Sequence, residues 1–261
     1  MTAATVARGR MPLAQHLGEA RRRAVRASVA LVVGAILGYV LSDQILDILR
    51  TPVAALAESR DAALNYDSVT GAFDLRLKIA LFAGVVLSSP VWLYELFAFL
   101  SPGLTRREKA YTFGFLGAAA PLFAAGCFMG FSVFPHMVEL LAGFASEEDS
   151  TILLASHYFD FVMKIIVATG VAFVLPVFIV MFNLLGVLSA RTIAKSWRIC
   201  IVAIMTFSAM VTPSADVLSM FLIAIPMCAL FAAAYLVAYL HDRRVARRIA
   251  RLETAPVPVT A

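Results

Sequence analysis

Long apolar stretches separated by short polar segments dominate the sequence. Measured between flanking charges, six of these stretches approach the roughly 20 apolar residues that a helix needs to cross a bilayer. The six predicted spans are Ala27–Ser42, Ile79–Leu100, Ala110–Phe134, Ile165–Gly186, Ile199–Thr212 and Val217–Leu240. The pattern therefore predicts an all-α membrane protein with six transmembrane helices. We expect a single polytopic domain, with an amphipathic segment at 1–23, the membrane region at 24–240 and a basic tail at 241–261.

The fifth span is unusually short. Its run of about 14 residues gives about 21 Å of helix, less than the thickness of an unperturbed hydrocarbon core. Pro213 ends this run, and we expect Asp216 to cap the helix that follows. Prolines also lie inside other spans, at Pro90, Pro121, Pro176 and Pro226. Each removes one backbone hydrogen bond and is expected to bend its helix, which favours a curved, concave arrangement.

The composition agrees with a membrane protein. Hydrophobic residues make up 61% of the chain and charged residues 15%, with a mean hydropathy of +0.87, whereas a soluble domain carries about 25% charged residues. The cysteines Cys127, Cys200 and Cys228 lie inside apolar runs, without a CxxC pair or a histidine at ligand spacing. We therefore expect no disulfide, no metal and no cofactor.

Positive charge is distributed unevenly between the spans. Most of the 22 lysines and arginines fall in four segments, namely Arg8–Arg26, Arg106–Lys109, Arg191–Arg198 and Arg243–Arg251. Cation-rich segments face the cytoplasm. Both termini and the loops 101–109 and 187–197 are thus predicted to be cytoplasmic, and 43–75, 136–157 and 212–216 external. The net charge of +5 is explained by this orientation and by contact with anionic lipid, and not by nucleic acid.

The first polar cluster precedes the first span. His16, Glu19, Arg23 and Arg26 share one side of a helical pattern, which predicts an amphipathic helix lying on the inner leaflet. Glu19 is the only acid in the first 42 residues. If Glu19 has a purely structural role, we expect it to form an ion pair with Arg23, four residues further on, which would stabilise the helix by about 0.3 to 0.5 kcal/mol.

The second cluster closes the second span. Thr105 and Glu108 have the spacing of a capping box for the third span. Glu95 lies one turn inside the boundary, where we expect it to reach the interface or to pair with Arg106 or Arg107.

The third cluster is Asp160 and Lys164, at the outer end of the fourth span. Their spacing of four residues predicts an intramembrane ion pair. The sequence contains no HExxH, GxGD or GxSG motif, so we expect no enzymatic activity and an intramembrane hydrolase has no nucleophile and base to use. A secondary transporter of a small solute remains the alternative function, although no acid lies near the middle of a span.

Four fragments occurring in order among six spans give the chain a resemblance to the TatC family, the multi-span receptor subunits of the twin-arginine protein translocase. They are His16-Leu17-Gly18-Glu19, the segment Tyr94 to Glu108, Phe173-Val174-Leu175-Pro176-Val177 and Thr212-Pro213-Ser214-Ala215-Asp216. The likeness covers about Leu13 to Asp242. It implies a curved wall of six helices, with spans five and six short, in a bacterial inner membrane.

The resemblance also implies a function. Members of the family bind paired-arginine signal peptides of folded proteins, and recruit single-span subunits of the TatA and TatB type for export driven by the proton gradient. Carried over to this chain, the signal-binding residues are Glu19, Glu108 and Phe99, with His16 in the same motif. The chemistry is suitable, because planar carboxylates form stronger and more selective pairs with guanidinium groups than with lysine.

Partner helices are expected at the hairpin of spans five and six. The family resemblance implies docking at Thr206, Ala209, Met210 and Met220, and self-association in a receptor complex. The chain also departs from the family. Val174 stands where many members carry an acid or an amide, and Gly18 and Ala20 replace the larger residues usual around Glu19.

Overall fold

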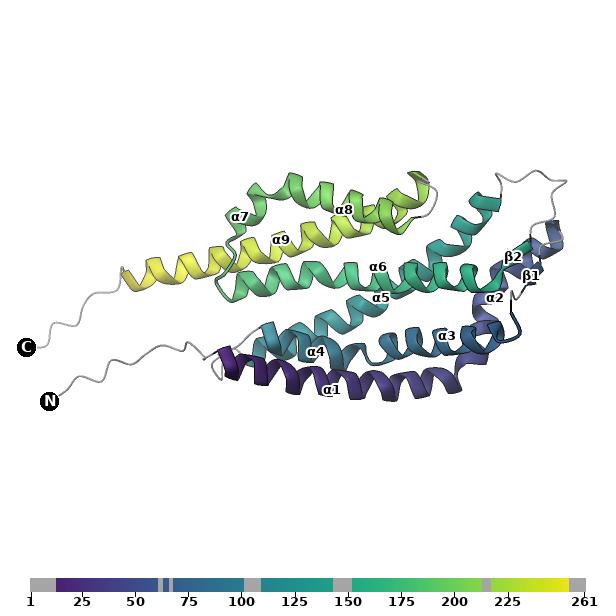
Figure 1. The fold of residues 1–261 in the computed structure, drawn as a ribbon. Coiled ribbons are helices and arrows are strands. Elements are labelled where there is room, and N and C mark those ends of the chain that lie inside the picture. The colour runs from purple at the N-terminus through teal and green to yellow at the C-terminus, as the bar shows by residue number, and fades with distance from the viewer. Residues whose placement is uncertain are drawn as a thin grey trace, which may run out of the picture.

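The computed structural model describes residues 13–60, 63–65, 68–100, 109–142, 152–212 and 217–253. Most of these residues are helical, and two short strands form one pair (Figure 1). In chain order the elements are α1 (Leu13–Val40), α2 (Ser42–Arg60), β1 (Ala63–Asn65), α3 (Gly71–Leu87), α4 (Ser89–Leu100), α5 (Lys109–Ala142), β2 (Ile152–Leu154), α6 (Ala155–Leu184), α7 (Ala190–Lys195), α8 (Trp197–Val211) and α9 (Val217–Glu253).

The apolar helices correspond to the six predicted spans. α1, α5, α6 and α9 are each long and apolar enough to cross a membrane, and α3 with α4 forms a fifth, bent candidate. The sixth is α8, whose 15 residues give only about 22 Å of helix. The all-α, six-span prediction is confirmed, including the short fifth span.

Two helices are longer than the sequence predicted. α1 runs without a break from Leu13 to Val40, so residues 16–26 form the first turns of the spanning helix and the expected separate interfacial helix is absent from the described part of the chain. α9 continues for 37 residues. The expectation of a short sixth helix is therefore wrong, because the apolar run passes directly into the helical basic segment.

The second span, predicted as one helix, is broken at Ser88. α3 and α4 meet there at an angle of 57°. Pro90, in the first turn of α4, has no backbone N–H to continue the helical ladder. The indole Nε1 of Trp92 donates to the carbonyl of Val85 at 2.9 Å, and Ser88 Oγ donates to the carbonyl of Gly84 at 2.6 Å. Side chains thus satisfy backbone groups around the break, which makes the bend tolerable in an apolar setting.

The helices form an open row. α1 packs on α3 and α4, α4 on α5, α5 on α6, α6 on α9, and α9 on α8, with α5 crossing α6 obliquely (Figure 1). Only 11% of the residues in the apolar part of α1 are buried, compared with 44% in α6. α1 is therefore an edge of the row and α6 its centre, an arrangement in keeping with a wall of helices.

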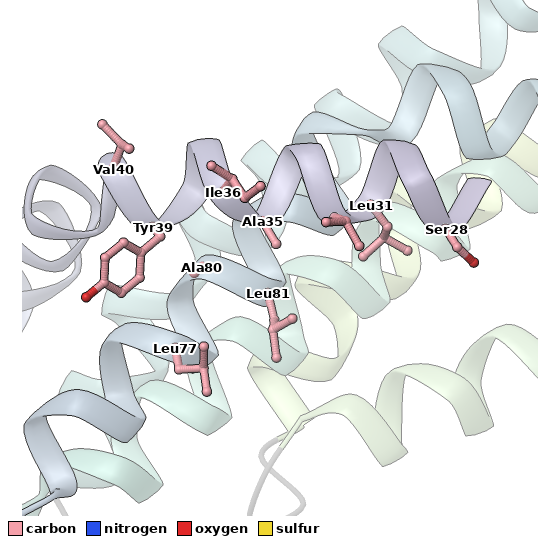
Figure 2. Close-up of a pocket in the computed structure, with 10 residues that line it drawn as sticks. Ser28, Leu31, Ala35, Ile36, Tyr39, Val40, Leu77, Ala80 and Leu81 are labelled. Atoms are coloured by element: carbon pink, nitrogen blue, oxygen red, sulfur yellow. The ribbon is translucent and has the colours of Figure 1, made fainter. Parts of the chain in front are cut away.

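Glycines let α1 approach α3 closely. A Cβ atom on Gly34 would lie 2.7 Å from the carbonyl oxygen of Gly84, and one on Gly38 would lie 2.6 Å from that of Ala80. Small residues four positions apart permit such backbone contact between membrane helices. Beside this contact is an apolar groove, where Tyr39 and other side chains of α1 face those of α3 (Figure 2).

α2, β1 and β2 lie together at the end of the molecule opposite to the beginning of α1 (Figure 1). β1 pairs in parallel with β2, a feature that the sequence did not predict. The hydroxyl of Tyr158 in α6 donates to the carbonyl of Leu49 in α2 at 3.0 Å, and Arg76 Nη2 lies 2.6 Å from Asp43 Oδ1. These contacts hold α2 against α3 and α6.

Candidate functional site

A cluster of charged side chains lies where the beginning of α1 meets α4. Glu19 and Arg23 lie one turn apart on α1, and two nitrogens of Arg23 contact the same carboxylate oxygen of Glu19. Arg23 Nη2 donates to Glu19 Oε1 at 2.6 Å and Arg23 Nε at 2.9 Å. The predicted pair between these residues is confirmed. Among the residues that the structure describes, none forms a hydrogen bond or an ion pair with the second oxygen of Glu19, Oε2.

Glu95 of α4 completes the cluster. Arg23 Nη1 donates to Glu95 Oε2 at 3.1 Å, and Arg26 Nη1 lies 3.6 Å from Glu95 Oε1. The side chain of Glu95 is only 8% exposed. A buried carboxylate is stable only when it is paired, so these two arginines explain how it is tolerated. The expected partners Arg106 and Arg107 lie outside the described residues, and the observed ones are on α1.

The sequence could not reveal this pairing, because Glu95 and Arg23 are 72 positions apart. Only the packing of α4 against α1 brings them together. One signal was present: a single acid inside an otherwise apolar span requires a cation from another element.

His16 and Phe99 lie beside the charged cluster. Their rings are stacked, with centroids 4.7 Å apart and an angle of 17° between the planes. The structure therefore brings together three of the four predicted signal-binding residues, where the beginning of α1 meets the end of α4. They are His16, Glu19 and Phe99. The fourth, Glu108, lies outside the described residues together with its capping partner Thr105.

The ion pair predicted between Asp160 and Lys164 is wrong. Asp160 Oδ2 instead accepts from Lys78 Nζ of α3 at 2.8 Å, whereas Lys164 is exposed. The reason is tertiary: α3 packs beside α6, and its lysine reaches Asp160 across the helix interface. A spacing of four residues permits a pair but does not exclude a stronger partner on a neighbouring helix.

A second polar network, not predicted, fixes the corner between α6 and α7. Asp242 of α9 accepts from the backbone N–H of Ala190 at 2.7 Å and from Asn183 Nδ2 at 2.9 Å. Asn183 Nδ2 also donates to the carbonyl of Leu188 at 2.9 Å. This clamp ties the start of α7 to the point where α9 leaves the membrane region.

The residues predicted to dock partner helices lie on the edge of the row. Thr206, Ala209 and Met210 of α8 are exposed, with 82% exposure for Met210, and Met220 of α9 is partly buried. Val174, by contrast, lies in an apolar cluster with Phe123. The valine therefore replaces a polar family residue in surroundings that favour an apolar side chain. Among the described residues, no group of three or more side chains could hold a metal ion.

These features define the class: an integral membrane protein with a row of helices and a charged cluster at one end of it. The chain belongs to the TatC family of Sec-independent protein translocase proteins, because the model of that family matches residues 15–226.

Relatives and solved structures agree with this assignment. The Sec-independent protein translocase protein TatC of Xylanimonas cellulosilytica is 44% identical over 245 residues, which cover 93% of this chain and 89% of the relative. That of Rothia mucilaginosa is 36% identical over 246 residues, covering 93% and 84%.

Two crystal structures of a twin arginine translocase receptor, TatC, have the same fold. One superposes with a TM-score of 0.72 and 27% identity, covering 86% of this chain and 98% of that one. The other, in DDM, gives a TM-score of 0.74 and 26% identity, covering 85% and 99%. Membership of a protein translocase family makes protein transport the role of this chain and disfavours the solute-carrier alternative.

Proposed function

We propose that the chain is the receptor subunit of a twin-arginine translocase. It binds the paired-arginine signal peptides of folded proteins and recruits single-span subunits for export driven by the proton gradient, a role without enzymatic chemistry. The observation that carries this proposal is the contact between Glu19 and Arg23. In it, a carboxylate near the beginning of α1 accepts hydrogen bonds from two nitrogens of one guanidinium.

Arginine suits this site better than lysine does. A guanidinium presents several donors in a fixed plane and can use two of them on one carboxylate, whereas an ammonium acts as a point charge. In this proposal Glu19 receives one arginine of the signal and Glu108 the other. The stacked rings of His16 and Phe99 provide an aromatic surface one turn from Glu19 for the residues that flank the arginines.

Substitution of Glu19 by Gln tests the proposal. It keeps the size of the side chain but removes its charge, and loss of a charge-assisted contact costs about 1.5 to 3 kcal/mol, or about tenfold to a hundredfold in affinity. We expect this loss for Glu19→Gln and Glu108→Gln at unchanged protein levels. The measurement is photocrosslinking of the protein to a paired-arginine and a paired-lysine signal peptide.

Asp47→Asn is the matched control, since this exposed acid lies on α2 at the opposite end of the molecule. Normal crosslinking and normal export in both glutamate variants would exclude these residues as the signal-binding site.

The proposed docking surface for partner helices is the exposed face of α8. It is supported by the shortness of α8, which leaves bilayer thickness uncovered, and by the exposure of Thr206, Ala209 and Met210. A cysteine at Met210 should form a disulfide crosslink with a cysteine in the span of a single-span subunit. A cysteine at the buried Ser208 should not. Equal crosslinking from both positions would contradict a specific surface on α8.

We also propose that both termini are cytoplasmic. α1 begins and α9 ends at the same end of the molecule, and α2 lies at the other end (Figure 1). The sequence places arginines in the first turns of α1 and in the last turns of α9. A membrane-impermeant thiol reagent should label a cysteine at position Ser150 in intact cells and spare one at Thr105. The reverse labelling pattern would invert the orientation.

A further inference from the structure

The proposed signal-binding carboxylate is already occupied. Arg23 places two nitrogens on Glu19 Oε1, at 2.6 and 2.9 Å, and its third nitrogen on Glu95 Oε2, at 3.1 Å. This is the contact that a guanidinium of a signal peptide would make. A signal arginine can therefore form a full bidentate pair with Glu19 only by replacing Arg23.

Glu95 makes this replacement feasible. Its carboxylate is 8% exposed and contacts Arg23 through one oxygen and Arg26 through the other, so it is too enclosed to receive an arginine from outside. When Arg23 leaves Glu19, however, Glu95 still holds it. No charge is then left unpaired in a weakly hydrated place, a situation that would otherwise oppose binding strongly.

We propose that Arg23 is a built-in competitor of the signal peptide and that Glu95 is the carboxylate that retains Arg23 during the exchange. This inference rests on the proposed function, because it takes Glu19 as a signal-binding residue. Arg23 sets the affinity threshold: a ligand remains bound only if it interacts with Glu19 better than the internal arginine does. Ligands with weaker contacts, such as paired lysines, fall below that threshold.

Competition makes a specific quantitative prediction. An internal competitor lowers the affinity of every ligand for the same carboxylate by the same factor. Weakening the competitor should therefore strengthen the binding of paired-arginine and paired-lysine peptides equally, and the ratio of the two affinities should stay constant. A residue that contacts the peptide directly would change that ratio.

Arg23→Lys is the variant to use. It keeps the positive charge beside Glu95, which protects folding, but replaces the planar fork by a single ammonium. We expect the dissociation constant of both peptides to fall by about fivefold, because the contact of two guanidinium nitrogens with Glu19 Oε1 is lost. Arg22→Lys is the matched control, because Arg22 is the exposed neighbour on the same helix, and its peptide affinity should be unchanged.

The assay is equilibrium binding of fluorescent signal peptides to the full-length protein in lipid nanodiscs, with size-exclusion elution as the test of folding. Weaker binding in Arg23→Lys, or a changed ratio of the two affinities, would overturn the proposal. The first result would mean that Arg23 positions Glu19 for the signal, and the second that Arg23 contacts it.

Glu95→Gln tests the second half of the inference. Without the retaining carboxylate, Arg23 stays on Glu19, and signal binding should weaken by about fivefold. The loss should be much smaller in an Arg23→Gln background, where there is no competitor to retain. An equal loss in both backgrounds would overturn the assigned role of Glu95.

Signal binding by Glu19 and competition by Arg23 are distinguished by separate variants. If Glu19→Gln binds the paired-arginine peptide normally, the proposed function fails at this site. If Glu19→Gln binds weakly but Arg23→Lys does not bind more tightly than the unmodified protein, only the competitor inference fails.

Discussion

The close contact between α1 and α3 offers a direct test of the packing. The perturbation is Gly38→Ala, which adds a single methyl group at the point of closest approach. The new Cβ would lie 2.6 Å from the carbonyl oxygen of Ala80 and 2.9 Å from the Cβ of Ala83. Carbon and oxygen atoms cannot approach so closely, and the obstacle is largely backbone, so one helix must move.

The magnitude follows from two opposing effects. Overpacking in a well-packed contact costs about 1 to 3 kcal/mol. Replacing glycine by alanine inside a helix returns about 0.5 to 1 kcal/mol. The net expectation is a loss of about 1.3 kcal/mol of stability at the midpoints of these ranges, measured by chemical unfolding in detergent micelles.

Gly117→Ala in α5 is the matched control, because a Cβ at Gly117 meets nothing within 4 Å. This variant should be unchanged or slightly stabilised. If Gly38→Ala proved as stable as Gly117→Ala, α1 and α3 would not pack as closely as described.

Two further predictions concern contacts that connect distant segments. In a double-mutant cycle with alanine, Lys78 and Asp160 should show a coupling energy of about 0.5 to 1 kcal/mol. The coupling energy between Lys164 and Asp160 should be close to zero. Equal coupling energies would refute the ion pair between α3 and α6. Tyr158→Phe should lower stability by about 0.5 to 1.5 kcal/mol, because it removes the hydrogen bond that joins α6 to α2. Tyr39→Phe, at an exposed position, should change thermal unfolding little, and a similar shift in both variants would argue against the hydrogen bond.

The sequence determined the main features of the fold. Apolar runs of spanning length are a local property, since every backbone group in a bilayer must be hydrogen-bonded within its own helix. The six spans and the short α8 could therefore be predicted without knowing any contact. The pair between Glu19 and Arg23 could also be predicted, because both residues lie on one turn of one helix.

Only the tertiary structure decided which charges pair across helices. Asp160 has a lysine four residues away on its own helix, yet its partner is Lys78, and the partners of Glu95 come from α1. An isolated acid in an apolar segment shows that a partner must exist, but its identity depends on which helices become neighbours and on how they rotate. The sequence therefore determined that Glu19 could hold a guanidinium. The packing of α4 against α1 determined that Arg23 is held there by two carboxylates.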